Sequence, residues 1–221
     1  MKPRIAIDGP AGAGKSTVAR AVARQLGLAY LDTGAMYRAI TVAALRENID
    51  LEDGDALGRL TRRLQLDIQS GEDNQNVIFL DGENVSEAIR LPVVSRGVSY
   101  VARCPEVRDV MVDKQRQIGA RGGTVMDGRD IGTNVMPDAE YKFYLTASLG
   151  ERARRRLAEL TAKGETLELP QMISEISARD KIDSERECAP LKAADDAIHI
   201  DTTEMTTEEV ISTIVHTVNG Q

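Results

Sequence analysis

Apolar residues alternate along the chain between short β-type runs and longer stretches with helical spacing. The run Arg4–Asp8 is apolar and β-prone, and after a glycine-rich segment Val18, Val22 and Leu26 recur at helical intervals. Further strands are predicted at residues 28–32, 122–127, 141–146 and 197–201, with helical patterns between them. We therefore expect an α/β fold of the P-loop NTPase type, with a parallel sheet of about five strands and helices on both faces.

The stretch between residues 64 and 85 breaks this α/β pattern. Leu64, Leu66 and Ile68 alternate with polar residues, and Asp81-Gly82 separates two further β-prone runs, which is a strong hairpin signal. We interpret this stretch as a small antiparallel β insert. The predicted organisation is a single domain over residues 1–221, with its core at 1–60, 98–147 and 188–221, an insert at 61–97 and a helical lid at 148–187.

Composition narrows the classes of function. The chain has 221 residues, of which 42% are apolar, enough to fill a core. The net charge of −7 argues against nucleic acid as a partner. The two cysteines, Cys104 and Cys188, lack metal-ligand spacing and are expected to be reduced thiols. The first apolar run breaks at Asp8 and no stretch approaches ~18 apolar residues, so we expect a cytoplasmic protein with neither signal peptide nor membrane span.

The glycine-rich segment after the first strand has the spacing of a phosphate-binding loop, Gly9-x-x-x-x-Gly14-Lys15-Ser16. The glycines let backbone N–H groups converge on a polyphosphate, the helix that follows directs the positive end of its dipole there, and Lys15 adds a full charge. Ser16 offers a hydroxyl to Mg²⁺. A glycine-rich turn that binds nothing is the alternative, but such a turn would need neither the Lys-Ser pair nor the flanking strand and helix.

Three other groups of residues point to phosphoryl transfer between nucleotides. One lies where a strand gives way to a helix, with Thr33 as the expected N-cap. Another follows a strand at its carboxyl end, where open α/β sheets bind ligands. A third shares one face of a helix, provided that the helix runs through all three residues. Taken singly, each has a simpler interpretation as a surface charge, a turn cap or a salt-bridge ladder. In the order described, the three groups are Thr33, Tyr37 and Arg38; Met126–Asp130; and Arg179, Asp183 and Arg186.

The chain resembles the bacterial cytidylate (CMP) kinase family over essentially its whole length. The resemblance is carried by IDGPAGAGKST, LDTGAMYRA, MDGRDIGT, the ERAxRR helix, and RDKIDSER followed by APL and IDTT. Many enzymes share the phosphate loop, whereas DGRDIGT and the RDxxDSxR stripe are specific. The resemblance implies Mg²⁺-dependent transfer of the γ-phosphoryl group of ATP to CMP or dCMP, in pyrimidine nucleotide metabolism. We expect a monomer that binds these nucleotides and neither nucleic acid nor membrane.

The resemblance also implies roles for individual residues. Contacts to cytosine match Ser99, Arg108 and Asp130, and contacts to ribose match Arg179 and Asp183. Contacts to the acceptor phosphate match Arg38, Arg129 and Arg186, beside Thr33 and Tyr37. ATP is assigned to Gly9, Pro10, Ala11, Gly12, Ala13, Gly14, Lys15, Ser16 and Thr17. The expected catalytic residues are Lys15, Arg129, Arg186 and Asp127. Asp127 or Asp130 is expected to relay a proton or hold a metal-bound water.

The arginine-rich helix at the start of the lid suggests a way to enclose ATP. Arg152 and Arg156 are one turn apart and are expected to close over the nucleotide, whereas Arg154 suits a solvated helix face. Two other functions stay open from the sequence. One is another P-loop small-molecule kinase, such as a shikimate or adenylate kinase-like enzyme, and the other is a regulatory module that binds nucleotides with little or no turnover.

Overall fold

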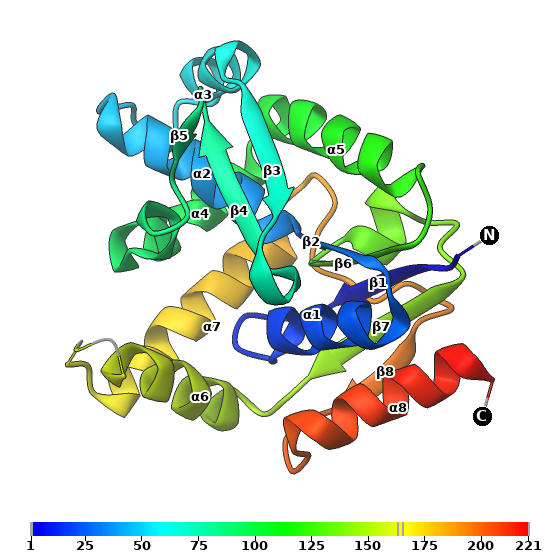
Figure 1. Cartoon of the computed structure of the whole chain (residues 1–221). Coiled ribbons are helices and arrows are strands. Elements are labelled where there is room, and N and C mark those ends of the chain that lie inside the picture. The colour runs from blue at the N-terminus through cyan, green and yellow to red at the C-terminus, as the bar shows by residue number, and fades with distance from the viewer. Residues whose placement is uncertain (1, 163, 165, 221) are drawn as a thin grey trace.

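Five parallel strands form the central sheet of the computed structural model, which describes residues 2–162, 164 and 166–220. Their order is β2-β6-β1-β7-β8, and every neighbouring pair is parallel (Figure 1). The predicted parallel sheet is therefore confirmed, and β1 with its phosphate loop lies at the middle of it. The strands are β1 (Arg4–Asp8), β2 (Ala29–Asp32), β6 (Thr124–Gly128), β7 (Tyr141–Thr146) and β8 (Ile198–Asp201).

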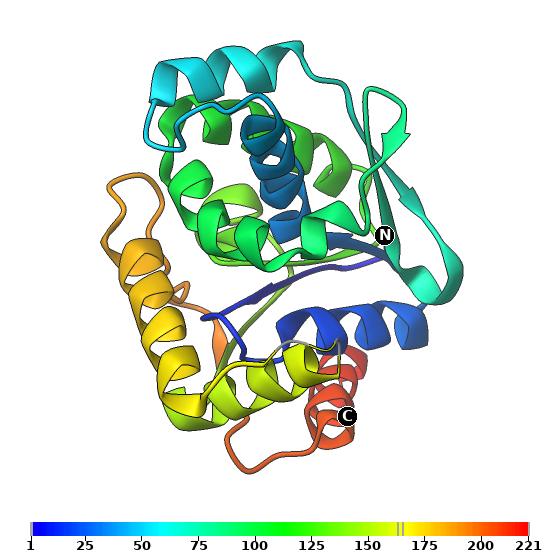
Figure 2. The same cartoon turned by 90° about the vertical axis from the view of Figure 1, so that its left-hand side faces the viewer.

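Helices cover both faces of this sheet because successive strand residues point to opposite sides. Ile5 and Ile7 of β1 pack with α1 and α8, whereas Ala6 between them packs with α2, α4 and α5. Figure 2 shows α1 and α8 below the sheet and α2, α4 and α5 above it. The bounds are α1 (Lys15–Leu26), α2 (Thr33–Arg46), α4 (Pro92–Arg103), α5 (Pro105–Gly119) and α8 (Thr207–Asn219).

The predicted antiparallel insert forms as a second, three-stranded sheet of β3 (Leu66–Ser70), β4 (Asn76–Leu80) and β5 (Glu83–Asn84). The Asp81-Gly82 turn joins β4 to β5 with positive φ at both residues, as the hairpin signal predicts. Asn76 attaches this sheet to the edge strand β2. Its side-chain amide donates to the carbonyl of Tyr30 at 2.8 Å and accepts from the N–H of Asp32 at 2.7 Å. One side chain thus continues the backbone hydrogen bonding of β2 toward the insert.

Two local features differ from the expectations. The sequence pattern does not predict the helix α3 (Gly54–Arg63), because its apolar residues Leu57 and Leu60 are few and are buried through packing against α2 and α5. Asp32, rather than Thr33, is the N-cap of α2, because its carboxylate accepts from the N–H of Ala35 at 2.8 Å. Thr33 is instead the first residue of the helix.

A helical hairpin, α6 (Leu149–Thr161) and α7 (Leu169–Glu185), occupies the segment predicted to be the lid. Its apolar side packs on Ala11 of the phosphate loop, and α7 also lies against α4 (Figure 1). Residues 163 and 165 of the predicted lid lie outside the described residues. Short helical turns complete the fold: η1 (Glu72–Asn74), η2 (Ala88–Arg90) and η3 (Ile131–Val135), the last of them π-helical.

Two further sequence expectations bear on the setting of the site. Cys104 and Cys188 are both free thiols. Within the described ranges 2–162, 164 and 166–220, no helix combines the length and the apolar character needed to cross a membrane. The boundaries proposed for the core, insert and lid stay predictions.

Candidate active site

The phosphate loop is shaped by its contact with neighbouring backbone. Gly9 has φ of +146°, and a Cβ there would collide with the carbonyl oxygen of Leu145 in β7. Gly14 has φ of +81° and is the residue from which α1 begins, with no atom within 4 Å of the Cβ position. Sterics therefore fix the start of the loop, and backbone conformation fixes its end.

Lys15 is a buried cation that the rest of the protein stabilises only weakly. The residue is 5% exposed, and Nζ donates to the carbonyl of Pro10 at 2.7 Å. Burial, and next the charge of Arg129, hold the pKa of Lys15 well below its ordinary value. A bound anion beside Nζ would oppose both effects, which is what a phosphate-binding lysine requires.

Asp127 lies beside the phosphate loop at the carboxyl end of β6. Its carboxylate accepts from the Ser16 hydroxyl at 2.8 Å and from the Tyr30 hydroxyl at 2.7 Å. Burial raises the pKa of Asp127 to about 6, and the charge of Asp32 adds to this effect. The hydroxyl of Ser16 and the carboxylate of Asp127 are the hard oxygen ligands that Mg²⁺ prefers.

These two oxygens fit a Mg²⁺ that keeps most of its ligands from phosphate and water. In the part of the chain that the structure describes, no group of three or more histidine, cysteine or acidic side chains is arranged to hold a metal. Mg²⁺ in nucleotide-binding sites commonly takes one or two protein oxygens and completes its shell with phosphate oxygens and water. The donor set is therefore suited to a metal that arrives with ATP.

Asp130 is the centre of a buried ion-pair network on the acceptor side. Its carboxylate binds Arg108 of α5, and it accepts from Nη2 of Arg186 at 2.9 Å and from the Asn134 amide at 3.1 Å. Arg108, Arg186 and Asp130 are all less than 10% exposed. Two of the residues predicted to contact cytosine, Arg108 and Asp130, are therefore brought together.

Arg186 reaches this network from outside the helix. Arg179, Asp183 and Arg186 are expected to share one helical face only if the helix runs through all three, and this condition is not met, because α7 ends at Glu185 and Arg186 has an extended backbone. Its Nε donates to the carbonyl of Ala189 at 2.7 Å, which turns the side chain toward Asp130. The three residues therefore do not form one row of ion pairs along a helix, and Arg186 instead binds Asp130.

Asp183 is the centre of a second network, next to the first. It accepts from the Ser99 hydroxyl at 2.9 Å and from Nε of Arg129 at 2.9 Å. Burial alone would raise the pKa of Asp183, but the charges of Arg129 and Arg179 outweigh burial and lower it. Nε of Arg179 is 3.9 Å from the carboxylate, beyond hydrogen-bonding distance, and is buried without a partner. Arg179 therefore keeps donor capacity for a ligand.

Four arginines converge beside these networks, and we call them the arginine cluster: Arg38, Arg129, Arg156 and Arg179. Burial, followed by the charges of Arg129, Arg38 and Arg156, lowers the pKa of Arg179 to about 10. Within the cluster, Arg38 is paired with Asp32 at 2.7 Å and Arg129 with Asp183. Like charges that act on one another in this way indicate a site for an anion.

Thr33 and Tyr37 lie behind the acceptor site. The Thr33 hydroxyl donates to the carbonyl of Asp127 at 2.7 Å, so it supports the strand end that carries Asp127. Tyr37 is buried with the Arg108 guanidinium 5.9 Å from its ring centre, and burial raises the pKa of Tyr37 to about 12. Both side chains are engaged within the protein.

The two lid arginines have different partners. Arg152 donates to the carbonyls of Ala147 at 2.9 Å and Ala11 at 3.1 Å and binds Asp180. Arg156 donates to Glu159 and reaches Ser95 of α4 at 3.3 Å. Arg152 thus holds the phosphate loop, whereas Arg156 belongs to the arginine cluster.

Sequence reasoning missed several residues that organise the site. Asp180 accepts from the N–H of Ala11 at 3.2 Å and also binds Arg152, so it links α7 to the phosphate loop. Tyr30 orients Asp127, and Asp8 supports the turn after Asp130. Asp8 had a usable signal, since it ends an apolar strand just as Asp127 does. Asp180 had none beyond its place in the RDKIDSER motif.

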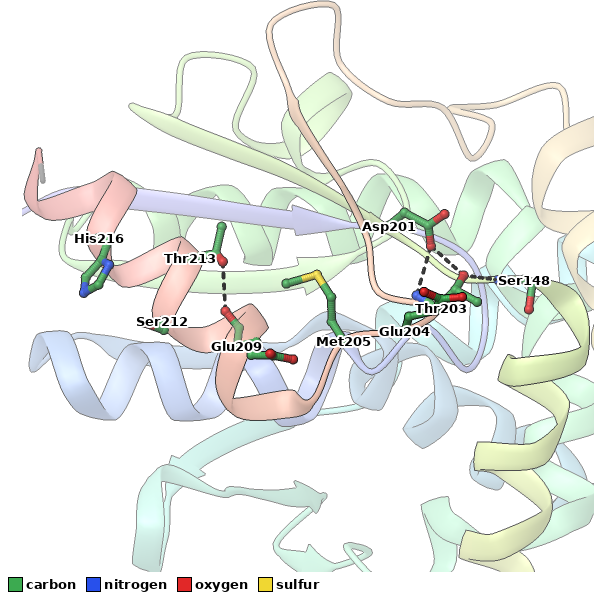
Figure 3. A pocket seen from close by; sticks show the side chains of 9 residues that line it. All are labelled: Ser148, Asp201, Thr203, Glu204, Met205, Glu209, Ser212, Thr213 and His216. Atoms are coloured by element: carbon green, nitrogen blue, oxygen red, sulfur yellow. Dashed lines mark hydrogen bonds between the residues drawn. The ribbon is translucent and has the colours of Figure 1, made fainter.

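A surface hollow lies away from these residues, between the start of α6 and the helix α8 (Figure 3). Asp201, Glu204 and Glu209 line it with negative charge, and none of its lining residues belongs to the predicted site. A polyphosphate would be repelled by such walls. The networks around Asp130 and Asp183, together with the phosphate loop, are therefore the candidate active site.

Solved structures similar to this chain share its fold. A gluconokinase from Sinorhizobium meliloti 1021 is 13% identical with a TM-score of 0.52, and the alignment covers 99% of this chain and 92% of that one. A shikimate kinase from Bacteroides thetaiotaomicron is 14% identical with a TM-score of 0.50, covering 98% of each chain. At these identities the likeness concerns the fold, which is that of P-loop kinases.

Sequence comparisons are more specific. Residues 5–220 match the family model described as cytidylate kinase. A cytidylate kinase from Caldanaerobacter subterraneus subsp. tengcongensis is 53% identical over 211 residues, which are 96% of this chain and 92% of that protein. Another, from Bacillus cereus strain ATCC 10987, is 51% identical over 216 residues, 98% of this chain and 96% of that protein. With motifs, fold and site in agreement, the chain belongs to the cytidylate kinase family.

Proposed function

We propose that this protein transfers the γ-phosphoryl group of Mg-ATP to CMP or dCMP, giving ADP and CDP or dCDP. The observation that carries the proposal is the arginine cluster beside Lys15. Asp127, two residues before Arg129, accepts from the hydroxyl of Ser16, the neighbour of Lys15, at 2.8 Å, so the cations of the two sites are neighbours. The charge of Arg129 accordingly lowers the pKa of Lys15. Transfer between two nucleotides needs two phosphate sites side by side, each with its own positive charge.

The acceptor is held by groups of suitable chemistry. Asp130 accepts from the exocyclic amine of cytosine, since a carboxylate has about four lone-pair positions and its arginine and asparagine partners leave capacity. Ser99 and Arg108 donate to acceptors on the base edge, and Asp183 accepts from a ribose hydroxyl while Arg179 donates. The fork geometry of Arg38, Arg129 and Arg186 suits a phosphate.

Catalysis rests on position and charge. The transition state spreads negative charge over the transferred phosphoryl oxygens, and Lys15 and Arg129 neutralise it. Arg186, which binds Asp130 in this structure, is the third cation that the family resemblance assigns to this charge. Ser16 and Asp127 would hold a Mg²⁺ that arrives with ATP, and such a metal would supply further charge neutralisation on the phosphate oxygens. The α6–α7 hairpin closes over the nucleotides and excludes water, which competes as an acceptor. The protein acts as a cytoplasmic monomer.

A panel of acceptors tests the proposal. The protein is incubated with Mg-ATP and CMP, dCMP, UMP, AMP or shikimate, and products are separated by anion-exchange chromatography. We expect ADP with equal amounts of CDP or dCDP, little transfer to the other acceptors, and no transfer when EDTA removes the metal. Preferred transfer to another acceptor would point to a different P-loop kinase, and ATP binding without any product would point to a regulatory module.

A further inference from the structure

Asp8 is a buried carboxylate that the catalytic scheme does not use. It is the last residue of β1, one position before the phosphate loop, and is 3% exposed. Each of its two oxygens accepts a backbone hydrogen bond: Oδ1 from the N–H of Ile131 at 2.9 Å and Oδ2 from the N–H of Gly132 at 2.8 Å. One side chain thus fixes two consecutive peptide groups.

Those peptide groups open the π-helical turn η3, directly after Arg129 and Asp130. The same turn returns to Asp130, whose carbonyl accepts from the N–H groups of Asn134 at 2.9 Å and Val135 at 3.2 Å. Asp8 also lies opposite Gly128 in the pairing of β1 with β6. The segment that carries the acceptor residues is therefore held to the phosphate-loop strand on both sides, by the sheet before it and by Asp8 after it.

Burial of an ionised carboxylate at this position costs free energy of folding, which indicates that the carboxylate has a specific role. Burial raises the pKa of Asp8 to about 6, and the two backbone hydrogen bonds and the charge of Lys15 oppose that effect only in part. An apolar residue would avoid the cost of burial but would leave two buried N–H groups without partners. An amide offers a single acceptor oxygen, so it cannot serve both N–H groups with the same geometry.

We propose that Asp8 is a positioning residue for the acceptor nucleotide: it fixes the turn that follows Arg129 and Asp130, and so sets where the base-reading carboxylate lies relative to the phosphate loop. The inference rests on the proposed function, because it assumes that Asp130 reads the base. Asp8 itself touches neither nucleotide and acts through the backbone of the turn.

Asp8→Asn is the variant that tests this role. Its amide group directs N–H toward a backbone N–H, so one of the two bonds is lost and the turn moves. A displacement of about 1 Å in a positioned group lowers turnover by as much as a hundredfold. We expect the ratio of kcat/KM for CMP to that for UMP to fall roughly tenfold and KM for CMP to rise, with KM for ATP within about twofold of wild type.

Two comparisons separate positioning from general loss of stability. Ile7→Ala removes a fully buried side chain from the same strand, on the face covered by α1 and α8, and is expected to lower the melting temperature while keeping the CMP:UMP ratio. Gly132→Ala acts on the turn from its other side, because a Cβ there would lie 3.4 Å from Oδ2 of Asp8 and 3.2 Å from the Lys142 side chain. It is expected to lower the ratio as Asp8→Asn does, and it replaces that variant in the test if Asp8→Asn does not fold.

The decisive experiment is a double-mutant cycle of Asp8→Asn and Asp130→Asn, with kcat/KM measured for CMP and UMP. If Asp8 acts through Asp130, Asp8→Asn lowers the ratio in the wild-type background and changes it no further beside Asp130→Asn. An unchanged ratio in Asp8→Asn, or an equal change in both backgrounds, overturns the proposal. Wild-type protein without CMP turnover would instead contradict the proposed function, so the two failures are distinguishable.

Discussion

The donor side and the acceptor side of the candidate site are built in different ways. The phosphate-binding part of the donor side is one continuous segment, residues 9–17, whose shape follows from glycine conformations and contact with neighbouring backbone. The acceptor side brings Ser99, Arg108, Asp130 and Asp183 together from four separate parts of the chain through buried ion pairs and hydrogen bonds. Backbone sterics therefore define one side, and charge balance defines the other.

This difference predicts how substitutions affect each side. A steric site tolerates loss of a side chain but not addition of one at a crowded glycine. A buried ion-pair network loses about 3–5 kcal/mol when one partner is removed, because the other charge stays buried without compensation. Substitutions on the two sides should therefore separate effects on turnover, folding and acceptor binding.

The largest expected effect is on kcat, and KM for CMP distinguishes a substitution on the donor side from one on the acceptor side. Lys15→Ala should lower kcat about a thousandfold while KM for CMP stays within about twofold, since Lys15 acts on charge that develops during transfer. Arg129→Ala should lower kcat to a similar degree and also raise KM for CMP, because Arg129 belongs to the arginine cluster and pairs with Asp183. Steady-state kinetics of both variants test this.

The control for these two variants is Lys192→Ala, which removes a side chain that is 69% exposed and should leave both constants unchanged. A Lys15→Ala enzyme with wild-type kcat would remove Lys15 from the mechanism. An Arg129→Ala enzyme with unchanged KM for CMP would remove Arg129 from the acceptor side.

The next effect concerns folding of the phosphate loop. Gly9→Ala places a Cβ against the carbonyl of Leu145 and should lower the free energy of unfolding by at least about 3 kcal/mol, as severe overpacking does. Gly14→Ala has open space around the Cβ position and should lose only about 1 kcal/mol, the cost of a left-handed conformation. Urea denaturation measures both. Equal losses would show that backbone contact does not define the loop.

A smaller effect is the pH dependence of the free energy of unfolding, which we expect from Asp127, the carboxylate between the two sides. Because burial raises the pKa of Asp127 to about 6, the folded protein binds this proton more tightly than the unfolded chain does. Ionised Asp127 therefore costs stability above pH 6, and the cost disappears as the pH falls toward the ordinary value of 3.8. Asp127→Asn should be more stable than wild type by up to about 3 kcal/mol at pH 7.5 and about equal to it near pH 4. A stability difference that does not change with pH would contradict this.

The same contrast explains what sequence reasoning achieved. The strands, the phosphate loop and the Asp81-Gly82 hairpin depend on neighbours in the chain, and their predictions are confirmed. The pattern does not reveal the helix α3, because Leu57 and Leu60 are buried only when α2 and α5 pack on them. The spacing of apolar residues within a short segment does not predict burial by helices that are distant in the sequence.

On the acceptor side, sequence supplied the residues but not their partners. That Arg186 leaves the helix to bind Asp130, and that Asp180 reaches the phosphate loop, depends on how α7 packs on the core. The pairing of Ser99 with Asp183 likewise joins residues predicted to contact different parts of CMP. The roles carried over from the family stay predictions until the acceptor is bound.

Asp130 is where the central claim, that an ion-pair network reads the acceptor base, can be tested most directly. Cytosine presents an amine where uracil presents a carbonyl, so the carboxylate attracts one base and repels the other. Such a charged mismatch costs on the order of 2–3 kcal/mol, or roughly two decades in kcat/KM. The measurement is kcat/KM for CMP and UMP on wild type and Asp130→Asn, with folding checked by thermal melting. We predict strong preference of the wild type for CMP and a ratio reduced by up to about two decades in the variant, chiefly through weaker use of CMP. An unchanged ratio would contradict the account and assign base choice to Ser99, Arg108 or the insert.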